Sequence, residues 1–198
     1  LWAPKVKTIF ESLYLKDFFE DQFFKCNILW GDAREKINII PSSIKFDLIY
    51  LDGFSPPKCP QVWTIEFLSK VTEKLNPQGY LITYSSSAAV RKTLRNLGLE
   101  IFSIKPNLDK RTFWSQGTVA ISKFDKNKLK PNFNFKKLSV MEEEHLLTKA
   151  SIPYRDQNLN SSKEDIIKKR TAEQLSSNLV STNKWREKWG MTKSSFKS

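Results

Sequence analysis

The stretch DLIYLDGFSPP, residues 47–57, decides the fold. Its apolar run leads directly into the carboxylate of Asp52, and such a run is typical of a strand buried on both faces of a parallel α/β sheet. Ligands of open α/β sheets bind beyond the carboxyl ends of the strands, where Asp52 would lie. Gly53 allows a sharp turn there, and the following prolines keep the loop out of helical conformation. The stretch therefore predicts a carboxylate held at the binding edge of a sheet.

Strand and helix patterns alternate on both sides of this stretch. We expect helices over residues 1–25, 33–40, 63–75 and 88–97, strands over residues 26–30, 46–51, 80–84, 99–105 and 117–124, and a turn at residues 76–79. This alternation predicts an α/β fold with a mostly parallel sheet and right-handed crossovers. The last two strands have no helix between them, so we expect them to pair antiparallel.

The chain changes character near residue 125. Residues 126–137 are rich in lysine, asparagine and phenylalanine and show no clear periodicity. Ser162 precedes a segment with charge pairs at helical spacing, and Ser181 precedes a shorter segment that Gly190 ends, so both serines are candidate helix caps. We expect residues 1–124 to form one domain and residues 125–198 a basic, partly helical extension.

Composition limits the functional class. The net charge is +12, from 33 basic and 21 acidic residues, which favours a nucleic-acid partner, although a lysine-rich solvated surface would give the same charge. The sequence shows no signal peptide and no run of eighteen apolar residues, so we expect no membrane segment. Cys26 and Cys59 are far apart and His145 is the only histidine, which favours the cytoplasm and argues against a metal site. The chain begins with Leu1, so we expect the native N-terminus to be missing.

The string LDGFSPPKCPQVW, residues 51–63, closely resembles the signature of the methyltransferase domain of the MnmC-like family. The segment PYRD, residues 153–156, is similar to a segment of cyanobacterial-type relatives of that family. The resemblance implies methylation of the aminomethyl group on the wobble uridine of certain tRNAs, with S-adenosylmethionine as cofactor and tRNA as partner. The residues alone leave a second interpretation open, a buried strand and loop in another Rossmann-like protein.

The resemblance also implies a Rossmann-like class I methyltransferase sheet. That fold has two further N-terminal strands and a glycine-rich loop, which we do not find in the sequence. We therefore expect the C-terminal part of such a sheet, followed by the extension. Gly31 and Asp32 resemble the cofactor-binding acidic pair of the family, and we add Asp52, Gly53 and Phe54 as candidate cofactor contacts. Asp32 could instead cap the next helix.

Asp52 is the candidate catalytic residue. The acceptor that the resemblance implies is an alkylamine, which is mostly protonated at neutral pH and attacks only through a free lone pair. Carboxylates are weaker bases than alkylamines by about six pKa units, so outright proton abstraction would cost roughly 8 kcal/mol. We therefore expect Asp52 to orient the amine and to stabilise positive charge on its nitrogen. The alternative is that Asp52 only caps its loop.

Candidate substrate contacts lie beyond the strand ends and on basic segments. Residues 85–91 resemble a family segment, and Tyr84 and Ser85 lie at the carboxyl end of the next strand, which would face the same crevice. Its hydroxyl groups could instead cap a helix, and its basic groups could be solvated. The candidate substrate contacts are Pro56, Lys58, Tyr84, Ser85, Arg91, Lys110 and Arg111.

Two other functions remain open on the sequence alone. The first is a noncatalytic RNA-binding module, because the glycine-rich cofactor loop is not found. The second is a Rossmann-like transferase that acts on a small amine, as spermidine synthases do.

Overall fold

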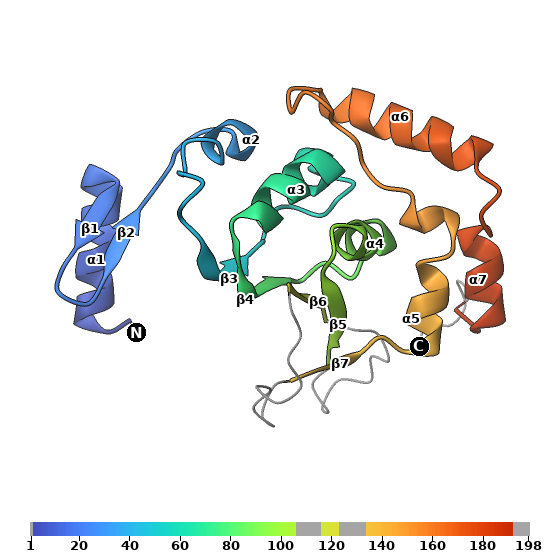
Figure 1. Ribbon diagram of the computed structural model, residues 1–198, viewed down its shortest axis with the longest axis horizontal. Coiled ribbons are helices and arrows are strands. Elements are labelled where there is room, and N and C mark those ends of the chain that lie inside the picture. Colours follow the sequence, from blue (N-terminus) through green and yellow to red (C-terminus); the bar gives the residue numbers. More distant parts are fainter. Residues whose placement is uncertain (1, 106–115, 123–133, 192–198) are drawn as a thin grey trace. The chain divides into compact units, whose positions relative to one another are not determined.

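The computed structural model describes residues 2–105, 116–122 and 134–191. Contacts divide the chain into two compact units, residues 1–40 and residues 41–198 (Figure 1).

The first unit combines a helix with a small hairpin. Its elements are α1 (Pro4–Lys16), β1 (Phe18–Glu20), β2 (Lys25–Asn27) and α2 (Ala33–Lys36), and β1 pairs antiparallel with β2. The prediction of helix up to residue 25 is wrong, because Asp17 takes a left-handed conformation with φ of 58° and ends α1. The Asp21 carboxylate then accepts the N–H groups of Phe23 and Phe24 and builds the hairpin turn. The strand predicted over residues 26–30 is shorter and lies in this hairpin.

The larger unit is built on a five-stranded sheet (Figure 1). Its elements are β3 (Phe46–Tyr50), η1 (Pro60–Trp63), α3 (Ile65–Glu73), β4 (Leu75–Thr83), α4 (Ala88–Asn96), β5 (Glu100–Ile104), β6 (Thr118–Ile121), β7 (Phe135–Lys137), α5 (Val140–His145), η3 (Lys149–Ser151), α6 (Lys163–Ser176) and α7 (Thr182–Lys188). The strand order is β3-β4-β6-β5-β7.

The sheet is mixed rather than mostly parallel. β3 and β4 are parallel, whereas β6 pairs antiparallel with both β4 and β5, and β7 pairs antiparallel with β5. The expected antiparallel pairing of the strands near residues 100 and 120 is confirmed. The prediction of a mostly parallel sheet is wrong for the described strands, because β6 lies between two strands that run in the same direction.

The core lies on both faces of this sheet. Leu81, Ala120 and Ile101 are directly opposed on β4, β6 and β5, so they share one face, and all three are buried. The other face carries a cluster formed by Phe102, Val119 and Ile121, with Tyr80, Ile82, Ile104 and Phe135 packed against it. Helices α3 and α4 contact the sheet and each other. The predicted apolar side of the helix near residues 63–75 is confirmed, since Trp63, Phe67, Leu68, Val71 and Leu75 are all buried.

Three local expectations need correction. β3 is not buried on both faces: among the described strands it lies at the edge of the sheet and pairs with β4 alone, and most of its residues are exposed. The turn predicted at residues 76–79 is part of β4, where a register shift in the pairing with β3 accommodates the irregular sequence. Helix α3 begins two residues later than predicted, because Thr64 is its N-cap and accepts the N–H of Phe67.

The extension contains the two predicted helices. Ser162 caps α6 by accepting the Asp165 N–H, and Ser181 caps α7 by accepting the Lys184 N–H, as expected. Helix α5 and strand β7 were not predicted. The boundary expected between residues 124 and 125 falls in the undescribed segment 123–133 and stays a prediction.

The PYRD segment fastens the extension to the start of α3. The Tyr154 carbonyl accepts the N–H of Ile65 at 3.0 Å, and the backbone N–H of Asp156 donates to the Glu66 carboxylate at 2.8 Å. The Arg170 guanidinium lies 4.3 Å from the centre of the Tyr154 ring, a cation–π contact that holds α6 to the same segment. These residues therefore link the extension directly to the end of the proline-rich loop.

Candidate active site

The candidate site lies at the carboxyl edge of β3 and β4. These strands are parallel neighbours, and the Leu51 N–H continues their ladder by donating to the Ile82 carbonyl at 2.9 Å. The two strands therefore end side by side, and Asp52 and Tyr84, which follow them, lie at the same edge of the sheet. The Asp52 side chain is exposed to solvent, so its carboxylate is available to a ligand.

Two aromatic side chains hold the loop that follows Asp52. The Tyr84 hydroxyl donates to the Gly53 carbonyl at 2.9 Å, and the Trp63 indole N–H donates to the Phe54 carbonyl at 2.7 Å. Desolvation, together with the negative charge of Asp52, raises the pKa of Tyr84 above its usual value, so the phenol keeps its proton at neutral pH. Tyr84 therefore both binds the loop that follows Asp52 and responds to the charge of the Asp52 carboxylate.

The rest of this loop is a compact turn. The Lys58 N–H donates to the Ser55 carbonyl at 2.7 Å, Pro56 is buried, and the side chains of Phe54 and Lys58 are exposed. Of the predicted contacts on this loop, Phe54 and Lys58 can therefore reach a ligand, whereas Pro56 shapes the turn.

A side chain at position 53 would not fit. A Cβ atom on Gly53 would lie 2.7 Å from a methyl group of Val62, so the loop needs glycine there.

Ser85 faces inward rather than toward the crevice. It is buried, its N–H donates to the Thr83 hydroxyl, and its hydroxyl accepts the N–H of Ser87. Its carbonyl accepts a 2.6 Å hydrogen bond from the Thr118 hydroxyl. These bonds shape the turn between β4 and α4, but no side chain in the described ranges caps α4, whose N-cap residue is Ser87.

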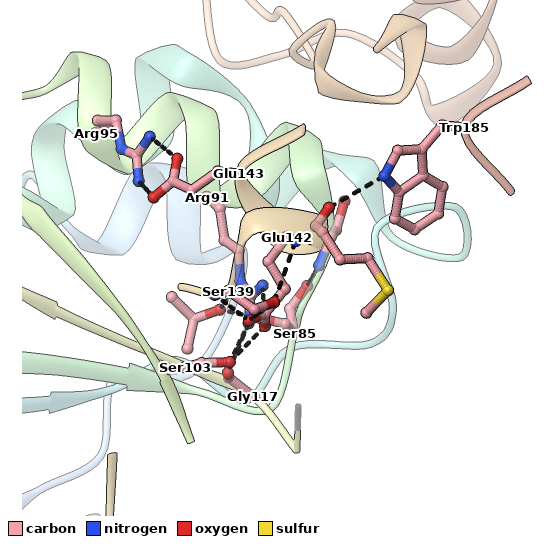
Figure 2. Close-up of polar contacts among 12 residues, drawn as sticks. Ser85, Arg91, Arg95, Ser103, Gly117, Ser139, Glu142, Glu143 and Trp185 are labelled. Atoms are coloured by element: carbon pink, nitrogen blue, oxygen red, sulfur yellow. Dashed lines mark hydrogen bonds and ion pairs between the residues drawn. The ribbon is translucent and has the colours of Figure 1, made fainter. Parts of the chain in front are cut away.

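Arg91 lies in a buried polar network (Figure 2). Its guanidinium donates to the Thr118 hydroxyl at 2.8 Å and to the Gly117 carbonyl at 3.0 Å. It also pairs with the Glu142 carboxylate at 2.9 Å, and the side chain is 1% exposed. Burial argues against a direct contact between Arg91 and a substrate, and the network connects α4, β6 and α5 instead.

Each carboxylate oxygen of Glu142 has its own partners. One oxygen accepts from Arg91 and from the Ser103 hydroxyl, and the other accepts the backbone N–H and hydroxyl of Ser139, completing a capping box for α5 (Figure 2). Burial opposes ionisation of Glu142, but the bonds from Ser103 and Ser139 and the charge of Arg91 outweigh it and lower the pKa. The Glu142 carboxylate is therefore ionised at neutral pH.

The predicted cofactor residues Gly31 and Asp32 lie in the first unit. Gly31 has a φ of 123°, which favours glycine, and Asp32 caps α2 by accepting the Arg34 N–H at 2.9 Å. The Arg34 guanidinium also binds the Asp32 carboxylate. This hydrogen bond is the main reason why the pKa of Asp32 is lowered. Asp32 therefore does cap its helix, and its role in cofactor binding stays a prediction.

Lys110 and Arg111 lie outside the described residues. Sequence reasoning missed Trp63 as a loop anchor and Glu142 as the partner of Arg91. The capping-box spacing of Ser139 and Glu142 indicates a helix start, but it does not indicate that Glu142 pairs with Arg91.

A separate cavity of about 330 Å³ lies between α5 and α7. It is lined by Glu144, Leu147, Thr148, Val180, Lys184, Trp185 and Lys188. None of these residues belongs to the edge that carries Asp52, so this cavity is not part of the candidate site.

Comparison with known proteins decides the family. Residues 5–117 match the family described as S-adenosyl-L-methionine-dependent methyltransferase, and this match covers more than half of the chain. The chain belongs to this methyltransferase family. The resemblance seen in the sequence is thereby confirmed, and the edge that carries Asp52 is the candidate active site of a methyltransferase that uses S-adenosylmethionine.

Three relatives extend the comparison. A crystal structure of MnmC2 from Aquifex aeolicus matches 89% of this chain and 54% of its own chain, with 29% identity and a TM-score of 0.73. An uncharacterised protein of Methanocaldococcus jannaschii is 29% identical over 170 residues, which are 84% of this chain and 44% of the relative. The tRNA 5-methylaminomethyl-2-thiouridine biosynthesis bifunctional protein MnmC of Campylobacter hominis is 35% identical over 72 residues, 36% of this chain and 10% of that protein. The chain thus spans about half the length, or less, of these relatives.

The described residues fit a methyltransferase cofactor in one respect. S-adenosylmethionine carries amino groups and a positively charged sulfur, and Asp52 offers an exposed carboxylate beside the exposed ring of Phe54. Within the described ranges, no group of three His, Cys, Asp or Glu side chains could hold a metal ion, and no helix is both long and apolar enough to cross a membrane.

Proposed function

We propose that this methyltransferase transfers a methyl group to the 5-aminomethyl group of a wobble uridine in tRNA. The observation that carries the proposal is the exposed carboxylate of Asp52 at the carboxyl edge of two parallel strands, on a loop that two aromatic side chains hold. A fixed carboxylate suits an acceptor that donates a hydrogen bond and gains positive charge during the transfer, as an amine does.

Asp52 acts on the acceptor amine. The bound S-adenosylmethionine supplies the methyl group. The Asp52 carboxylate accepts a hydrogen bond from the neutral amine, which directs the nitrogen lone pair, and its charge stabilises the positive charge that develops on that nitrogen. The acceptor ammonium group loses its proton to water before the attack, because the Asp52 carboxylate is too weak a base to abstract it, and the methylated amine carries the positive charge after the transfer.

Four features support a tRNA substrate. The Campylobacter hominis relative carries tRNA 5-methylaminomethyl-2-thiouridine biosynthesis in its name. The chain has a net charge of +12, which attracts polyanions, and the exposed ring of Phe54 next to Asp52 offers a surface on which an unstacked base can lie. Lys58 is exposed on the same loop and can contact a phosphate. Lys110 and Arg111 remain proposed RNA contacts.

The test is methyl transfer by the complete gene product. Protein is incubated under single-turnover conditions with labelled S-adenosylmethionine and with tRNA that carries either aminomethyl-uridine or unmodified uridine at the wobble position. We expect label to enter only the aminomethyl tRNA. Binding of S-adenosylmethionine measured by calorimetry separates the alternatives: a protein that binds tRNA but no cofactor is an RNA-binding module, and label in free spermidine or a similar amine indicates a small-amine transferase.

A further inference from the structure

Consecutive carbonyl groups on the loop after Asp52 are bound by side chains from different segments. The Gly53 carbonyl accepts from Tyr84, which follows β4, and the Phe54 carbonyl accepts from Trp63, which ends η1. Each donor is a neutral group with a single N–H or O–H, so each fixes the orientation of one backbone carbonyl of the loop.

The two donors also support each other. Their rings meet edge to face with centroids 6.4 Å apart and planes at 88°, a favoured aromatic geometry. Trp63 is 1% exposed, whereas Tyr84 is 46% exposed. The Trp63–Tyr84 pair therefore has one side chain anchored in the core and one that is exposed at the sheet edge that carries Asp52.

The backbone that follows Trp63 is bound to the extension. Thr64, the next residue, forms an isolated parallel bridge with Tyr154, and the N–H of Ile65 donates to the Tyr154 carbonyl. The loop that carries Asp52 is thus held from β4 on one side and from the docked extension on the other.

We infer that Trp63 and Tyr84 are positioning residues for methyl transfer, which hold the Asp52 carboxylate through the Gly53 and Phe54 carbonyls. This inference rests on the proposed function. The physical need is clear: Gly53 gives the backbone after Asp52 wide freedom, and a carboxylate stabilises a developing charge only if it is already in place. Displacement of a reacting group by about 1 Å can cost two orders of magnitude in rate.

The variant that tests the inference is Tyr84→Phe in the complete gene product. It removes one hydroxyl at a partly exposed position, so the thermal midpoint should stay within a few degrees. We expect single-turnover methyl transfer to fall roughly tenfold, with the Kd for S-adenosylmethionine and for tRNA unchanged. Tyr50→Phe is the matched control: Tyr50 precedes Asp52 by two residues, it is 71% exposed, and in the described part of the chain its hydroxyl has no hydrogen bond.

A double-mutant cycle shows whether Tyr84 acts through Asp52. In an Asp52→Asn background, Tyr84→Phe should cost less than twofold, because the group that it positions is already lost. Equal losses in both backgrounds, or an equal loss in Tyr50→Phe, overturn the inference.

Amide hydrogen exchange keeps the inference testable if the wild-type protein does not methylate aminomethyl tRNA. Tyr84→Phe and Trp63→Phe should speed exchange in a peptide covering residues 51–63, and Tyr50→Phe should not. Faster exchange without any methyl transfer would remove the proposed function and leave only a structural clamp, whereas unchanged exchange would remove the clamp itself.

Discussion

Replacing Glu142 by Gln should destabilise the protein strongly. The carboxylate is 4% exposed and is the charged partner of Arg91, whose side chain is 1% exposed. The amide keeps the size of the side chain, but it loses the charge and puts an NH₂ donor in place of one of two oxygens that both accept hydrogen bonds. Breaking a buried ion pair from one side costs about 3–5 kcal/mol. Because Arg91 keeps its bonds to Gly117 and Thr118, we expect the lower end of this range.

Glu143→Gln is the matched control. Glu143 is the next residue, and it binds Arg95 with both oxygens at 2.7 and 2.9 Å, but its side chain is 46% exposed (Figure 2). A solvent-screened pair of this kind contributes about 0–1 kcal/mol. Urea denaturation of both variants measures the difference in the free energy of unfolding. Equal losses in the two variants would refute the assignment of the buried network as the contact that fixes α5 to the sheet.

Three more predictions concern other parts of the molecule. Gly117→Ala should lower the free energy of unfolding by roughly 2 kcal/mol, because its Cβ atom would overlap the Thr83 carbonyl oxygen; thermal melting will show an unchanged midpoint if this is wrong. The pKa of His145 is lowered from 6.5 to about 4, mainly by burial and secondarily by the charges of Arg91 and Arg186, while Glu142 opposes the shift. As the pH falls, the unfolded chain therefore takes up a proton on this residue before the folded chain does. Stability should therefore drop by roughly 1–2 kcal/mol from pH 7 to pH 5, and His145→Gln should remove this dependence in urea titrations; identical pH profiles would contradict it. Lys110→Ala with Arg111→Ala should flatten the log–log salt dependence of tRNA binding by roughly 1–2 units, and an unchanged slope in filter binding would exclude both residues from the interface.

Features that depend on neighbouring residues could be predicted from the sequence. The strand before Asp52 was found because an apolar run that ends in a carboxylate and glycine is a local pattern, and β3 lies where it was expected. The caps at Ser162 and Ser181 were found for the same reason, since a cap binds groups only two or three residues away.

Features that depend on distant contacts could not be predicted. Arg91 and Glu142 are 51 residues apart, and nothing near Arg91 in the sequence indicates that its charge is buried. Arg91 was therefore predicted as a substrate contact, like any arginine on a helix beyond a strand end. The exposure of β3 has a similar origin, because an apolar run gives the strand but not the number of its neighbours in the sheet.

The candidate site shows the same division. Asp52 and Tyr84 were each predicted from the strand that precedes them, and the parallel pairing of β3 and β4 brings both to one edge. The hydrogen bonds that join their loops run between residues 9 and 31 positions apart, and such bonds follow from the tertiary fold alone.

Single-turnover methyl transfer by Asp52→Asn in the complete gene product tests the central claim most directly. The substitution keeps the size of the side chain and its capacity to accept hydrogen bonds but removes the charge. Because that charge matters most in the transition state, we predict that the rate with aminomethyl-uridine tRNA falls about a hundredfold, equivalent to about 3 kcal/mol. The thermal midpoint should change little, since the side chain is exposed, and the affinities for S-adenosylmethionine and tRNA should fall much less than the rate. A stable Asn variant with full activity, or a loss of activity that only follows a loss of stability, would contradict the assignment of Asp52 to the reaction centre.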